Sequence, residues 1–145
     1  MKKKIILVVL ALILVGGGVV YYQWNKPKRT AANEKPIVSL AADDLYTQFV
    51  NDETGSNGKY NNKVVEVKGR ILSFEAKEPE VTEGQPKPKS EFIIYLETSD
   101  MIGTVSCTLV PGETATIKEG QDVTIKGICN GYLTDVVLTQ CALVQ

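Results

Sequence analysis

The chain of 145 residues carries few side chains that could perform catalysis or hold a metal. It has three cysteines and no histidine. Without histidine there can be no Ser-His-Asp triad, no Cys-His pair and no imidazole-ligated zinc or haem. The cysteines form no Cys-x-x-Cys motif and are joined by no other set of metal ligands. We therefore expect no catalytic residues, no metal and no cofactor, and we predict that the protein is not an enzyme.

Two polar segments resemble ligand-binding loops only superficially. Gly55–Tyr60 (GSNGKY) has the wrong spacing for a phosphate-binding loop, and Asn51–Gly55 (NDETG) lacks the alternating oxygen ligands of a calcium loop. We interpret both segments as turns that follow a helix.

The three cysteines allow two interpretations. Outside the cytoplasm, a disulfide between Cys129 and Cys141 is plausible and would tie two predicted strands together. A tight turn at Asn130–Gly131 would separate these cysteines, so the bridge requires a longer loop or a bent last strand. Alternatively, all three cysteines are core residues, and Cys107 alternates with apolar neighbours as a buried cysteine does. A redox role for the three thiols remains a third functional possibility.

Four basic or aromatic residues are the candidate binding residues: Lys68, Arg70, Tyr95 and Tyr132. Such side chains on one face of a sheet could stack nucleobases or sugars. The alternative is that they are ordinary exterior residues of a β domain.

The net charge of −1 conceals two oppositely charged parts. Residues 1–35 hold seven basic groups and one acid, a net charge of +6, whereas residues 36–145 hold nine basic and 16 acidic groups, a net charge of −7. A polyanion is bound mainly through Lys and Arg, so the acidic part makes nucleic acid an unlikely partner.

Residues 1–24 are predicted to be a transmembrane helix. Ile5–Val20 is an uninterrupted apolar run, followed by Tyr21, Tyr22 and Trp24. At about 1.5 Å per residue, the segment from Ile5 to Trp24 spans roughly 30 Å, the thickness of the hydrocarbon core of a bilayer. We favour an uncleaved signal anchor over a cleaved signal peptide, because no A-x-A site directly follows the run.

Basic residues flank both ends of this helix, but the very short N-terminal tail favours an N-terminus inside the cytoplasm. The domain after the helix would then lie outside the cytoplasm, anchored in the cytoplasmic (inner) membrane. Residues 25–36 contain two prolines and mixed charge, and are predicted to be an extended linker.

Residues 37–145 are predicted to form one mainly β domain. A helix should begin near Ser39, carry Asp43 and Asp44 in its first turn, and end within Asn51–Gly55. Five segments after it alternate apolar and polar residues in the manner of strands. They are residues 63–74, 91–98, 102–110, 122–129 and 133–144.

The connections between these strands indicate how the sheet closes. Gly69 suggests a bend or bulge in the first strand, and residues 75–90 a long loop. A helical turn is expected around Thr114–Lys118, and a tight turn at Asn130–Gly131. Because an open five-stranded sheet would leave unprotected edges, we predict a five-stranded Greek-key barrel, the OB-fold, preceded by one helix.

Two segments resemble OB-fold sequences: Lys63–Gly69 (KVVEVKG) and Lys118–Gly127 (KEGQDVTIKG). Together with the Cys129…Cys141 ending, they make residues 40–145 similar to the tRNA_anti-like family of bacterial OB-fold proteins, whose members are often described as lipoproteins. No cysteine lies near the leader of this chain, so a helix must replace the lipid anchor. The resemblance implies the shape of an anticodon-binding domain, but neither tRNA binding nor any activity.

We therefore expect a membrane-tethered, non-enzymatic binding module of the cell envelope. Its partner would be a protein, a glycan or a small molecule. The alternatives are a single-stranded nucleic-acid binder that uses Lys68, Arg70 and Tyr95, and a thiol-redox protein of the envelope.

Overall fold

The computed structural model describes residues 2–26, 29–77, 91–110 and 117–144, with side chains from Ile13 onward. Helix α1 (Lys2–Trp24) is followed by a single 3₁₀ turn, η1 (Ala31–Asn33). The domain then contains strand β1 (Ser39–Ala41), helices α2 (Ala42–Asn51) and α3 (Glu53–Tyr60), and five longer strands. These are β2 (Val64–Lys77), β3 (Glu91–Leu96), β4 (Val105–Leu109), β5 (Asp122–Tyr132) and β6 (Val136–Leu143).

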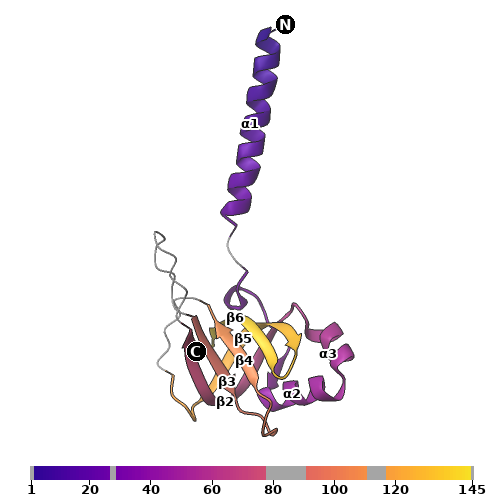
Figure 1. Ribbon diagram of the computed structural model, residues 1–145, viewed down its shortest axis with the longest axis vertical. Helices are drawn as coiled ribbons and strands as arrows, with labels where there is room; N and C mark the ends of the chain where they lie inside the picture. The colour runs from indigo at the N-terminus through magenta and orange to yellow at the C-terminus, as the bar shows by residue number, and fades with distance from the viewer. Residues whose placement is uncertain (1, 27–28, 78–90, 111–116, 145) are drawn as a thin grey trace.

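The five longer strands form a closed barrel (Figure 1). The sheet runs β2-β3-β4-β6-β5, and β5 pairs back onto β2 to close the ring. β4 and β6 run parallel, and the other pairs in the ring are antiparallel. This order is the Greek-key arrangement of an OB barrel. The predicted five-stranded barrel is confirmed, and the structure adds the short strand β1, which pairs in parallel with β2.

Alternation of apolar and polar residues positions the core as expected. Val65, Val67 and Ile71 of β2 are buried, whereas Lys68 and Arg70 between them are exposed. Inward-facing residues from every strand of the ring pack against helix α2 in one cluster. Helix α2 contributes Leu45 and Phe49, and the strands contribute, among others, Ile94, Leu96, Cys107, Leu109, Ile125 and Leu138. Burial of this apolar surface is the main force that holds the barrel and helix together.

The helical region differs from the prediction of one helix that begins near Ser39. Ser39 belongs to β1, and α2 starts at Ala42 with Asp43 and Asp44 in its first turn. A second helix follows at once, because the Asp52 carboxylate accepts a hydrogen bond from the Gly55 N–H at 2.9 Å and caps α3. Residues 53–60 are therefore helix rather than turns.

Three local features lie elsewhere than predicted. The irregularity of β2 falls between Ile71 and Ser73, not at Gly69. β5 continues through Asn130–Gly131 to Tyr132, and the connection to β6 comes at residues 133–135. Gly131 has a φ of +101°, a conformation that glycine adopts readily and that lets the strand continue. Residues 75–77, predicted to begin the long loop, are the end of β2. The rest of that loop and most of the helical turn around Thr114–Lys118 lie outside the described residues.

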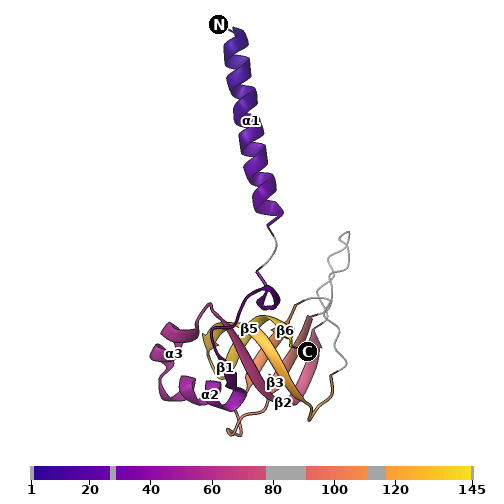
Figure 2. The ribbon, with the colours of Figure 1, turned by 180° about the vertical axis from the view of Figure 1, so that it is seen from behind.

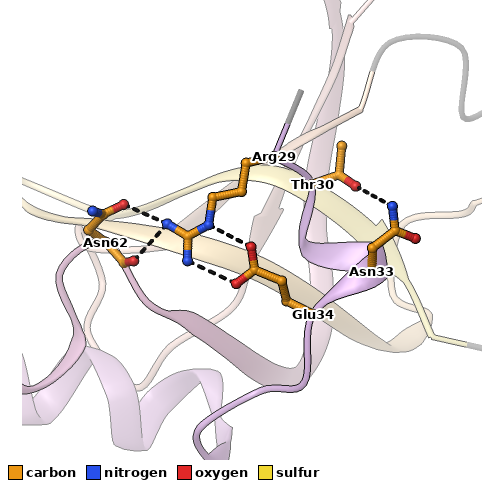
Figure 3. A network of polar contacts seen from close by, with 5 residues as sticks. All are labelled: Arg29, Thr30, Asn33, Glu34 and Asn62. Carbon is orange, nitrogen blue, oxygen red and sulfur yellow. Dashed lines mark hydrogen bonds and ion pairs between the residues drawn. The ribbon is translucent and has the colours of Figure 1, made fainter. Parts of the chain in front are cut away.

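The linker is not an extended stalk in its second half (Figure 3). Arg29 donates two hydrogen bonds to the Glu34 carboxylate, at 2.6 and 2.9 Å, and two to Asn62, at 2.8 Å to Oδ1 and 3.0 Å to the carbonyl oxygen. Ala31 is fully buried against Val64 and Ile128. Residues 29–34 therefore already contact the folded domain, before the predicted boundary at residue 37.

Helix α1 stands away from the barrel in both views (Figures 1 and 2). Over the part of the chain whose side chains the structure describes, from Ile13 onward, no helix is both long and apolar enough to cross a membrane.

Candidate binding surfaces

Lys68, Arg70 and Tyr95 come to the outer surface of the barrel. Lys68 lies opposite Thr124 of β5, and Tyr95 lies between Ser73 and Ser106 on its two neighbouring strands. Tyr95 points outward because its neighbours in β3, Ile94 and Leu96, are buried. The irregularity between Ile71 and Ser73 separates the two basic residues from Tyr95 along β2. These three residues therefore lie on the outer surface, where both interpretations of the sequence expect them.

Acidic side chains lie next to the basic ones on this surface. Arg70 Nε is 3.7 Å from Asp122 Oδ1, and the Arg70 carbonyl accepts the N–H of exposed Glu97 at 2.9 Å. Glu66, two residues before Lys68, accepts a hydrogen bond from the Ser39 hydroxyl. Positive charge is therefore compensated locally, and among the described residues this surface shows no cationic groove of the kind that tracks a nucleic-acid backbone.

Tyr132 does not join this surface. Its ring packs at 5.9 Å from Tyr46 and 6.1 Å from Phe49, centroid to centroid, under helix α2. Hydrogen bonding to Tyr132, with burial and the nearby Asp100 carboxylate, raises the pKa of Tyr46 well above its ordinary value. Tyr132 thus connects helix α2 to the barrel. No local sequence pattern predicts this contact, because Tyr132 and helix α2 are far apart in the chain.

The three cysteines are buried thiols, and no disulfide joins Cys129 to Cys141 in this structure. Cys129 lies opposite Leu138, three residues before Cys141 in β6. Cys141 instead lies over Gly127, where an added methyl group would come within 2.6 Å of its sulfur. Desolvation raises the pKa of Cys129, which disfavours the reactive thiolate. Within the described residues, no group of His, Cys, Asp or Glu could hold a metal ion.

Shallow depressions lie beside the helices, and two of them include residues of the barrel or its loops. One, of about 520 Å³, is lined by asparagines at the end of α3 and just after it, and by residues around the β5–β6 connection: Asn57, Asn61, Asn130, Gly131, Tyr132, Leu133 and Val137. The other, of about 270 Å³, lies between α2 and the β3–β4 loop. Sequence reasoning missed the second because it placed Ile102 in a strand, whereas β4 begins only at Val105. The sequence predicts a turn at Ser99–Asp100, and Gly103 was the further signal that the turn continues toward β4.

Comparisons with known proteins agree with the barrel. A crystal structure from Klebsiella pneumoniae subsp. pneumoniae MGH 78578, named as a "putative nucleic acid-binding lipoprotein", superposes with a TM-score of 0.56. It is 16% identical, and the alignment covers 73% of this chain and 91% of that one, a likeness that establishes the fold alone. A comparison with curated proteins gives no match. The model of the tRNA_anti-like family matches residues 1–143, and the chain therefore belongs to the tRNA_anti-like family.

Proposed function

We propose that the protein is a membrane-tethered, non-enzymatic OB-fold binding module of the cell envelope. The observation that carries the tether is that Lys2–Trp24, which contains the apolar run Ile5–Val20, is one continuous helix of 23 residues. At about 1.5 Å per residue, such a helix is roughly 35 Å long, which matches a bilayer. The aromatic residues Tyr21, Tyr22 and Trp24 would lie at the membrane boundary.

The contacts of Arg29 support a short tether. Because Arg29 is bound to Glu34 and Asn62, only residues 25–28 separate the end of α1 from the folded domain. Four residues span at most about 15 Å. The domain would therefore remain close to the membrane surface, with the η1 side of the barrel nearest to it. The very short N-terminal tail favours a domain outside the cytoplasm.

The ligand class is argued from the surface of the domain. Residues 36–145 carry a net charge of −7, and acids accompany Lys68 and Arg70 on the outer face. This charge favours a protein, a glycan or a neutral small molecule over a polyanion. No enzymatic constellation supports catalysis within the described part of the chain, and the buried thiols do not support a redox role.

Topology can be tested by labelling, because all three native cysteines are buried. Glu119→Cys would add one exposed thiol in the turn before β5. A membrane-impermeant maleimide should label this variant in intact spheroplasts, whereas a Lys3→Cys variant should be labelled only after lysis. Carbonate extraction should leave both in the membrane fraction. Labelling of Lys3→Cys alone in intact spheroplasts, or release by carbonate, would contradict the proposal.

A second candidate, single-stranded nucleic-acid binding, is favoured by two observations. The Klebsiella pneumoniae structure carries a nucleic-acid-binding name, and Arg70 and Tyr95 share the outer surface of this barrel. Titration of the full chain in detergent with a fluorescent oligonucleotide, at low and high salt, tests it. Salt-dependent binding that is lost in Arg70→Ala and retained in Lys59→Ala would support this candidate, and no binding at low salt would dismiss it.

A further inference from the structure

The β3–β4 loop is held in place by hydrogen bonds to helix α2 and by bonds within the loop itself. The Ser99 N–H donates to Asp43 Oδ1 of α2 at 2.7 Å, and the Ile102 N–H donates to Asp100 Oδ1 at 3.0 Å. The Tyr46 hydroxyl donates to Asp100 Oδ2 at 3.2 Å. These bonds fix the loop at both sides of its tip.

Gly103 locks the same loop sterically. A methyl group at Gly103 would lie only 1.9 Å from the Tyr46 hydroxyl oxygen, so the loop backbone runs directly against the tyrosine ring. The Thr98 hydroxyl also donates to the Gly103 carbonyl and draws the two ends of the loop together. The loop is therefore ordered before it meets any partner.

This ordered loop presents apolar side chains to solvent. Met101 is fully exposed, Ile102 is 80% exposed, and Val50 of α2 is 52% exposed. Val50 lines the depression of about 270 Å³ together with Tyr46, Thr47, Ser99 and Asp100. Adjacent exposed apolar side chains mark interaction sites more often than scattered ones do, and methionine is enriched at interfaces. A loop that is already ordered loses little conformational entropy on binding.

The charges around the loop restrict the kind of partner. Asp100 lines the depression, Asp43 accepts the N–H of its neighbour Ser99, and Asp44 follows Asp43 in the first turn of α2. None of the residues that line the depression is basic. These acids disfavour nucleic acid and anionic lipid. The loop also lies at the end of the barrel opposite α1, which both views show (Figures 1 and 2). If the tether proposed above is correct, the loop points away from the membrane.

We propose that Met101, Ile102 and the depression beside Val50 form a docking surface for a protein segment that carries an apolar side chain between lysines or arginines. The apolar side chain occupies the depression, and the flanking cations pair with Asp43, Asp44 and Asp100. Only the direction in which the surface faces rests on the proposed tether; the docking itself does not.

A photo-crosslinking experiment with the full chain in maltoside detergent tests this surface. The probe is a pentapeptide with photo-leucine between two pairs of lysines, and the reference peptide has glutamates in place of the lysines. We expect crosslinks from the lysine peptide on residues 99–102 and Val50, at a yield that falls with added salt. The glutamate peptide should give at least about tenfold less, as expected when like charges face each other.

Two variants distinguish the surface from nonspecific binding. Met101→Ser/Ile102→Ser should reduce the yield about tenfold, a loss typical of central contact residues. Leu72→Ser, which removes a 51% exposed leucine from β2, should leave it unchanged. Equal yields with both peptides, crosslinks elsewhere on the barrel, an unchanged yield in the double variant or no crosslink at all would overturn the proposal. None of these outcomes bears on the maleimide test of the tether.

Discussion

Arg29 and Asn62 are 33 positions apart, yet the Arg29 guanidinium donates to both the side-chain oxygen and the carbonyl oxygen of Asn62. The opposite edge of the same guanidinium binds the Glu34 carboxylate through two hydrogen bonds. Asn62 has a φ of +59°, a conformation that asparagine tolerates better than most residues, and this turns its carbonyl toward the arginine. One side chain thus fastens the segment after α1 to the turn that opens the barrel (Figure 3).

Arg29→Ala should release residues 29–36 from the barrel while leaving the barrel folded. The pair is exposed, so the global midpoint of thermal unfolding should hardly change. Endoproteinase Glu-C should instead cut after Glu34 several times faster, because the segment around it is no longer held. Mass spectrometry of limited digests measures this rate. Lys59→Ala, an exposed change on α3, is the control, and equal cleavage rates in both variants would contradict the role assigned to Arg29.

Gly127→Ala should destabilise the barrel by about 2 kcal/mol or more, as overpacking of a filled core does. The added methyl group would lie 2.6 Å from Cys141 Sγ and 2.9 Å from Leu138 Cβ. Adding Cys141→Ala to this variant should recover part of the loss, because it removes the nearer atom. Denaturant unfolding of the single and double variants measures both effects.

Gly58→Ala is the matched control for this substitution. Gly58 lies within α3 with no atom within 4 Å of an added methyl group, so alanine should stabilise the protein by about 0.5–1 kcal/mol. Destabilisation by Gly58→Ala, or no effect of Gly127→Ala, would contradict the packing described for these two glycines.

The three cysteines should react slowly with a maleimide in the folded protein and fast in denaturant. All three are buried, and burial raises the pKa of Cys129, so the thiolate that reacts is scarce. Mass spectrometry of protein prepared without reductant counts the labelled thiols. A count of one after complete unfolding, with a peptide that joins Cys129 to Cys141, would show instead the disulfide predicted from the sequence.

The strands were predictable because each carries its own alternation. Val65, Val67 and Ile71 face inward regardless of the exact residues at which the strand begins and ends. Burial of these residues therefore fixes the register of β2. The second helix was not predictable in the same way. Its sequence (ETGSNGKY) contains two glycines and favours a turn, and only the Asp52 cap and the buried Tyr60 make it a helix.

The candidate site was only partly predictable for a similar reason. Alternation alone places Lys68, Arg70 and Tyr95 on the outer face. The positions of Tyr132 and Met101 depend on contacts with helix α2, which lies at least 50 positions away from either residue in the chain. No local pattern carries that information.

Acid should loosen the β3–β4 loop before it unfolds the barrel. The hydrogen bond from Ser99 lowers the pKa of Asp43, and the N–H of Ile102 lowers that of Asp100. Because both carboxyls have a lower pKa in the folded state, their contribution is present above the ordinary value of 3.8 and is lost as the pH falls through the folded value. The loop should therefore be unchanged between pH 7 and pH 5.

NMR spectroscopy of the Ser99 amide tests this. Its ¹⁵N–¹H chemical shift should titrate with a midpoint below pH 3.8. In Asp43→Ala the Ser99 chemical shift at pH 7 should move to a value typical of a solvent-exposed amide. In Asp44→Ala it should not change. A Ser99 midpoint at or above 3.8 would mean that the bond to Asp43 does not hold the loop in solution.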